Sequence, residues 1–230
     1  MSQIQLHKKE AEAPAGQSQK RPAHQSVYET LRDQLLFGEL APGQAVTIQG
    51  LVEDMGAGMT PVREALRRLI ANGALHMMGN RRVTVPTMSL ADIEQVEFMR
   101  KTLEPHLAGL AVENMNDGLI DDLVNQDNAL NEAIAQGDIK AYLLNNYLFH
   151  ARLNDAANAP ILKATVDRLW LRFGPSLRVV CGRYGTLNLP DKHADLLLAL
   201  KDRNQAAAEK AMAEDVAQGM MQIRETLQQD

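Results

Sequence analysis

The segment from Thr60 to Leu69, TPVREALRRL, most constrains this chain, because it predicts a short helix with a sharp start and two unlike faces. Thr60 is the predicted N-cap and Pro61 the first helical residue. The face predicted to be buried carries apolar residues at helical spacing: Val62, Ala65, Leu66 and Leu69. The opposite face carries Arg63, Arg67 and Arg68. Such a helix suits the major groove of DNA, although a solvated surface helix shows the same pattern.

Length and composition favour two mostly helical domains. The chain has 230 residues, 45% of them hydrophobic and only 4% aromatic. The single cysteine, Cys181, excludes an intrachain disulfide framework and a cysteine-rich zinc site. No apolar run approaches the roughly 18 residues that span a membrane, and no signal-peptide core is present. We therefore expect a cytoplasmic protein without a membrane partner, and a disordered polar arm over residues 1–22.

Charge is distributed unevenly along the chain. The net charge is -5, which is unusual for a protein that binds DNA. Residues 55–85, however, hold five arginines against one acid, Glu64, and the acidic excess lies after residue 89. A basic patch on an acidic protein still attracts phosphate, because the Debye length in physiological salt is about 8–10 Å.

The surroundings of the arginine helix predict a winged helix-turn-helix domain over residues 23–86. One helix is expected over 26–38, capped by Ser26 and closed by Gly38, and a second from Thr47 or Ile48 to Met55. Residues 56–58, all glycine or alanine, then turn into the arginine helix. Residues 76–85 predict a small β-hairpin with Arg81 and Arg82 near its tip.

This N-terminal half resembles the GntR family of bacterial transcription regulators. The resemblance rests on Tyr28-x-x-Leu31-Arg32, Gly38-x-Leu40-x-Pro42-Gly43 and Thr60-Pro61-Val62-Arg63-Glu64-Ala65-Leu66-x-x-Leu69. It implies that Arg63 touches the operator and that the wing tip reaches the minor groove. The predicted DNA contacts are Arg32, Thr60, Arg63, Arg67, Arg81 and Arg82. Gly58-Met59 stands where the family usually has Ser-Arg, so one base-reading arginine is absent.

Residues 89–229 predict an all-α bundle of six or seven helices. Ser89 is expected to cap the first, and further helices are expected near 117–136, 138–157, 160–180, 190–202 and 204–228, with a loop at 181–189. This C-terminal part of the chain resembles the FCD ligand-binding domain of the FadR subfamily. The matching stretches are Arg100-x-x-Leu103-Glu104-Pro105, Phe149-His150 and His193-x-x-Leu196-Leu197-x-Ala199-Leu200.

The resemblance also implies a divalent metal site of the zinc, nickel or manganese type. In the metal-binding branch of the FCD family one Asp and three His supply the ligands, and these positions align with Asn146, His150, His193 and Asp215. Two of the four are therefore altered, yet two imidazoles, a carboxylate and an amide oxygen remain. Alternatively, His150 and His193 line a pocket for an organic ligand without a metal.

Arg100 is the leading candidate to bind a carboxylate of an effector, since guanidinium binds carboxylates through two hydrogen bonds. The predicted effector-binding residues are Arg100, Asn146, His150 and His193. Arg172 and Arg178 lie on a later helix and are expected to form salt bridges instead.

The favoured function is a transcription regulator, expected to repress, that binds a palindromic operator in double-stranded DNA as a homodimer. A small organic acid in the bundle would modulate its DNA affinity. One alternative is a metalloenzyme that activates water at His150, His193 and Asp215. Another is an architectural DNA-binding protein without an effector.

Overall fold

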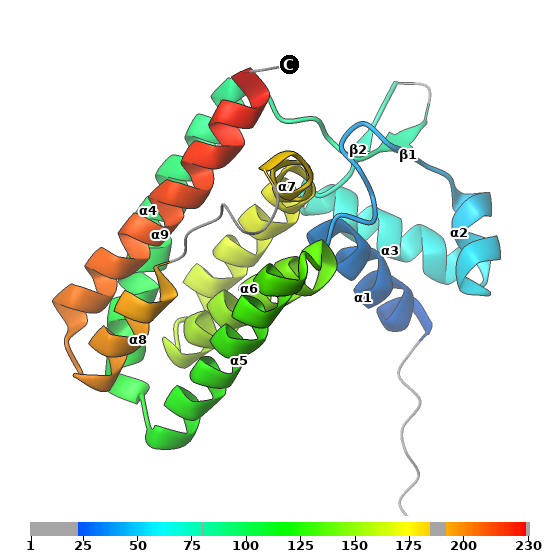
Figure 1. The fold of residues 1–230 in the computed structure, drawn as a ribbon. Helices are drawn as coiled ribbons and strands as arrows, with labels where there is room; N and C mark the ends of the chain where they lie inside the picture. The colour runs from blue at the N-terminus through cyan, green and yellow to red at the C-terminus, as the bar shows by residue number, and fades with distance from the viewer. Residues whose placement is uncertain (1–22, 80, 185–191, 229–230) are drawn as a thin grey trace, which may run out of the picture.

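The computed structural model describes residues 23–79, 81–184 and 192–228 (Figure 1). Within these described ranges, a small N-terminal head carries three helices and three short strands, and a bundle of six helices follows. The mostly helical fold predicted from the sequence, with a winged head and an all-α bundle, is confirmed. The predicted disordered arm at 1–22 lies outside the described residues.

The head is built from α1 (Ala23–Leu36), α2 (Ile48–Met55) and α3 (Met59–Ala71), around a fully buried apolar core. The core residues that are 0% exposed are Leu31 and Leu35 of α1 and Val62, Ala65 and Leu69 of α3. These are the apolar positions at helical spacing, so burial of one α3 face follows directly from the sequence pattern.

Three antiparallel strands form the wing. They are β1 (Ala45–Val46), β2 (His76–Met77) and β3 (Val83–Thr84), in the order β1-β3-β2. Thr84 pairs with His76 on one side and with Ala45 on the other. The expected hairpin is therefore present, but β1 was not predicted, because two residues are too short to show an alternating pattern.

Two predicted helix starts in the head are wrong. Helix α1 already begins at Ala23, so Ser26 lies inside it rather than capping it. Helix α3 begins at Met59 with Gly58 as N-cap, so Thr60 is the second helical residue. Pro61 is still tolerated, because the first N–H groups of a helix have no intrahelical acceptor.

The bundle consists of α4 (Leu90–Asn114), α5 (Asp117–Gln136), α6 (Ile139–Ala156), α7 (Pro160–Tyr184), α8 (His193–Lys201) and α9 (Gln205–Gln228). Ser89 caps α4 as predicted, in a reciprocal hydrogen-bonded pair with Asp92. Helix α7 runs past the expected end at residue 180, and the rest of the predicted loop at 181–189, from residue 185, lies outside the described residues. No helix in the described ranges is both long and apolar enough to cross a membrane.

Helices α4 and α9 lie side by side and α5 packs on α6, while α7 contacts α4, α6 and α9 in the bundle and α1 in the head (Figure 1). At the head, Gly174 of α7 lies against the backbone of Leu36 in α1. The ring of Phe37 meets the ring of Tyr147 from α6 edge-on, with centroids 6.0 Å apart. The head therefore rests on α6 and α7 through close contacts.

Candidate DNA interface and effector cavity

The solvent face of α3 presents the arginines that the sequence predicted. Arg63 and Arg67 are exposed, and Arg67 Nη1 lies 3.0 Å from Glu64 Oε2. Arg68 differs, because its guanidinium lies over the ring of Tyr28 at 3.7 Å and donates a hydrogen bond to Gln25 of α1. Arg68 therefore ties α3 to α1, while Arg63 and Arg67 face outward.

Arg81 and Arg82 are exposed between β2 and β3. Arg81 adopts a left-handed backbone with φ 64°, and its N–H donates to the carbonyl of Met78 at 2.9 Å. This tight turn brings two cationic side chains close to the end of the wing, as the sequence predicted. A cation there can reach a phosphate or a narrow minor groove.

Arg32 lies between the head and the bundle. Its Nη2 is 2.6 Å from Asp33 Oδ1, and its side chain is half-buried. Burial acts to lower its pKa, but Asp33 and, more weakly, Tyr147 of α6 raise it. The structure therefore gives Arg32 a local ion pair beside the bundle, and its predicted contact with DNA stays a prediction.

A cavity of about 40 Å³ lies inside the bundle between α4, α6, α7 and α9. It brings together four residues from the sequence prediction: Arg100, Asn146, His150 and Asp215. The remaining lining residues are Tyr142, Trp170, Phe173, Leu177, Gly219, Gln222 and Ile223.

His150 bridges two carboxylates at this cavity. Its Nε2 lies 3.3 Å from Asp215 Oδ2, and its Nδ1 lies 3.4 Å from Glu104 Oε2. Burial acts to lower the pKa of His150, but the adjacent carboxylates of Asp215 and Glu104 outweigh it and raise that pKa to about 9. Burial likewise acts to raise the pKa of Asp215, yet His150 holds it well below its usual range.

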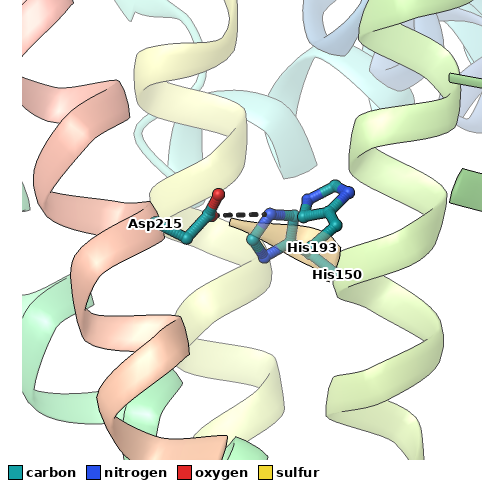
Figure 2. A group of neighbouring side chains, drawn as sticks. All are labelled: His150, His193 and Asp215. Atoms are coloured by element: carbon teal, nitrogen blue, oxygen red, sulfur yellow. Dashed lines mark ion pairs between the residues drawn. The ribbon is translucent and has the colours of Figure 1, made fainter. Parts of the chain in front are cut away.

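His193, the first residue of α8, faces His150 from the neighbouring helix (Figure 2). It is fully buried and stacks on Phe149 with ring centroids 3.9 Å apart. One ligand atom from each of His150, His193 and Asp215 lies within 4.8 Å of the others. The structure therefore assembles three of the four predicted metal ligands, and the fourth, Asn146, lies one helical turn before His150 on the same cavity.

Each imidazole has a carboxylate behind it. His193 Nδ1 is 3.0 Å from Asp127 Oδ1 of α5, and His150 Nδ1 is 3.4 Å from Glu104 Oε2 of α4. A carboxylate on one ring nitrogen fixes the tautomer and leaves the other nitrogen for a metal. The donor chemistry and the spacing therefore fit a divalent cation.

No role was predicted for Asp127 or Glu104, although the position of each in its helix indicates a buried carboxylate. Asp127 interrupts an apolar stripe of α5 at helical spacing, between Leu123 and Leu130, both fully buried. Glu104 is 0% exposed in the corresponding stripe of α4. A carboxylate in a stripe that packs into the core requires a buried partner.

Arg100 reaches the cavity but is paired with Glu104. Its Nε and Nη2 both donate to this carboxylate, and the guanidinium stacks on Phe173 at 4.2 Å. The remaining nitrogen, Nη1, points to the sulfur of Met220 at 3.5 Å, which is a weak acceptor. Arg100 thus keeps one nitrogen with capacity for a stronger acceptor.

Trp170 adds a second donor that sequence reasoning missed. Its indole lines the cavity, and within the described part of the chain no acceptor meets its buried Nε1–H. An aromatic residue in a helical apolar stripe carries no signal that separates a core role from a pocket role. Arg172 and Arg178 lie elsewhere, against Gly73 and Gly38 of the head.

Two family models match this chain. The model described as bacterial regulatory proteins, gntR family, matches residues 23–85, and the model of the FCD domain matches residues 95–218. The first covers the head and the second covers the helices that surround the cavity.

Known relatives of the chain are transcription regulators, in agreement with these two family models. The chain is 31% identical over 200 residues to the HTH-type transcriptional regulator McbR of Escherichia coli K12, covering 84% of this chain and 89% of McbR. It is 24% identical over 222 residues to the repressor RspR of the same organism, covering 89% and 92%.

A solved structure of E. coli McbR superposes with a TM-score of 0.85 at 28% identity, covering 92% of this chain and 100% of that one. A GntR regulator from Rhodococcus sp. RHA1 shares the fold, with a TM-score of 0.69 at 20% identity over 87% and 96% of the two chains. These comparisons give the metalloenzyme alternative no support. The chain belongs to the GntR family, and it is a helix-turn-helix transcription regulator with an FCD effector-binding domain.

Proposed function

We propose that this regulator is a repressor that binds a palindromic operator as a homodimer in the bacterial cytoplasm, and that a small carboxylate effector changes its DNA affinity. The name of the relative RspR, a transcriptional repressor, supports repression rather than activation. The observation that carries the proposal is the polar cavity buried beside α7, the helix on which the head rests.

The DNA contacts are assigned to α3 and the wing. Arg63 and Arg67 read the major groove from the exposed face of α3, while Arg81 and Arg82 hold the backbone or the minor groove. A homodimer places two such heads on half-sites related by twofold symmetry, which matches a palindromic operator.

The effector is assigned to the cavity between α4, α6, α7 and α9. Arg100 Nη1 and Trp170 Nε1 are two buried donors that suit a carboxylate. The present volume of about 40 Å³ holds only a few waters, so an organic acid has to widen the cavity as it enters. The effector is therefore small, and its binding moves the lining helices.

A divalent cation of the zinc, nickel or manganese type is assigned to His150, His193 and Asp215, with Asn146 as a fourth donor. When bound, it supplies a positive charge with open positions for oxygen donors. Glu104 and Asp127 hold the two imidazoles in place from behind. The Arg100 guanidinium lines the same cavity and orients the carboxylate.

Helix α7 connects this cavity to the head. Trp170, Phe173 and Leu177 line the cavity from one of its faces. Gly174 and Arg178, on another face of the same turns, contact α1 and Gly38. An effector that shifts α7 therefore changes the position of the head, and linkage requires that DNA changes effector affinity in return.

The test begins with operator sequences selected from a randomised duplex library by the wild-type protein. Arg63→Ala should then lose specific binding in fluorescence anisotropy and keep the wild-type oligomeric state and circular dichroism. Arg168→Ala, which removes an exposed arginine from the bundle, is the matched control and should bind as the wild type. Equal affinity of Arg63→Ala and the control would refute the assigned reading helix.

A further inference from the structure

We propose that Met59 is a specificity-determining residue, and that its side chain contacts the 5-methyl group of a thymine in the major groove of the operator. No role follows for Met59 from the arginine pattern of α3. The inference rests on the proposed assignment of α3 as the DNA-reading helix, and it does not depend on the effector or the metal.

Met59 is positioned at the end of α3 that enters the groove. It is the first residue of the helix, directly after the N-cap Gly58. Residues at the N-terminus of a recognition helix are the ones that contact base edges. Arg63 follows four residues later, so both side chains project from the same side of the helix, one turn apart.

The exposure of Met59 indicates that packing within the head does not explain it. Its side chain is 52% exposed, whereas Val62 and Leu66 on the packed face of α3 are buried. An exposed apolar side chain gains free energy when it leaves water for contact with an apolar group of a ligand.

The turn before α3 lets the duplex approach this side chain. Residues 56–58 are Gly, Ala and Gly, so the turn just before Met59 carries no side chain larger than a methyl group. Within the described residues no side chain forms a capping hydrogen bond to α3, and a Cβ placed on Gly58 would meet only the ring of Pro61, at 3.6 Å. The open N–H groups of the first turn can donate hydrogen bonds to a phosphate, which seats the helix end-on in the groove.

The chemistry of the groove then selects the base. The thymine methyl is the apolar group that a base pair presents in the major groove, whereas guanine presents two acceptors there. A thioether side chain donates no hydrogen bond, so it would desolvate the guanine acceptors without replacing their water. Burying one methyl group corresponds to a factor of about four in affinity.

The experiment removes only the methyl group. Each thymine of the selected operator is replaced in turn by deoxyuridine, and affinities are measured by fluorescence anisotropy. The wild-type protein should lose about fourfold at one thymine per half-site. Met59→Ala should bind thymine and deoxyuridine equally at that position, and Met59→Leu should keep the discrimination.

A second selection supplies an independent readout. Met59→Arg should replace the thymine preference with guanine at the same position, because arginine donates two hydrogen bonds to guanine. Met221→Ala, which truncates an exposed methionine of α9 in the bundle, controls for general effects and should keep the wild-type ratio. The proposal is overturned if Met59→Ala keeps the wild-type thymine-to-deoxyuridine ratio at every thymine.

Discussion

Gly174 of α7 lies against Leu36 of α1 so closely that a Cβ at residue 174 would meet both the Cα and the carbonyl oxygen of Leu36 at 3.3 Å. The neighbour is backbone rather than a flexible side chain, so it cannot move aside easily. This contact joins the helix that lines the cavity to the head that reads DNA.

We therefore predict that Gly174→Ala lowers the free energy of unfolding by about 1–2 kcal/mol, because it overpacks the contact between head and bundle. Gly219→Ala is the control, since a Cβ at 219 in α9 meets no atom within 4 Å. Removing a helical glycine there should raise stability by about 1 kcal/mol. Urea unfolding of both variants measures the difference, and equal effects would contradict the prediction.

The buried ion pair of Arg100 and Glu104 gives a second prediction. Arg100→Met leaves the carboxylate of Glu104, at 0% exposure, with His150 as its remaining charged partner. We expect a loss of about 3 kcal/mol in unfolding free energy, at the low end for breaking a buried ion pair. The double variant Arg100→Met with Glu104→Gln removes both charges and should recover much of this loss. If the double variant is as unstable as the single one, the cost comes from lost packing and not from the loss of the charge partner.

The stability of the metal-free protein should fall as pH rises. The pKa of His150 is raised from 6.5 to about 9, so the protonated ring stabilises the fold fully below pH 6.5. That contribution is lost as pH rises through about 9, and it is on the order of 1–3 kcal/mol. Unfolding by urea in the presence of a chelator, at pH 6 and at pH 9.5, measures the loss.

His150→Gln should flatten this pH dependence, because the variant has no ring to protonate. His106→Gln, at an exposed position of α4, should keep the wild-type slope. Identical slopes in all three proteins would show that the pair of His150 with Asp215 does not govern this pH range.

Asp127→Asn should weaken divalent metal binding about 10- to 100-fold, because the amide no longer holds the ring of His193 by a charged hydrogen bond. Calorimetric titration of the chelator-treated protein with Zn²⁺ and with Mn²⁺ measures the change. Asp121→Asn removes an exposed acid from the same helix, so its affinity should stay at the wild-type value. Unchanged affinity in Asp127→Asn would place His193 outside the metal site.

Local patterns in the sequence accounted for much of this molecule. The buried face of α3 and the cap of α4 at Ser89 depend on neighbours within a few residues, and the structure shows them. The resemblance further placed Asn146, His150 and Asp215 on one cavity. The buried face and the cap could be predicted because residues within one or two helical turns determine them.

The missed features have different physical causes. Asp127 and His193 are 66 residues apart and meet only because α5 packs against α8. Arg100 was expected to be available for an effector, and its pairing with Glu104 becomes visible only with both side chains placed. The start of α3 was misjudged by two residues, because the N-cap is Gly58, which has no capping side chain, and Thr60 was the better candidate by residue type.

The separation of charge between head and bundle has a consequence for how the protein meets DNA. The basic residues of α3 and the wing lie at one end, and the acidic excess lies beyond residue 89. In the field of a duplex, this arrangement acts as a dipole and turns the head toward the phosphates before any contact is made. Collisions in which the bundle arrives first are repelled, so productive orientations are enriched during diffusion along and toward the operator.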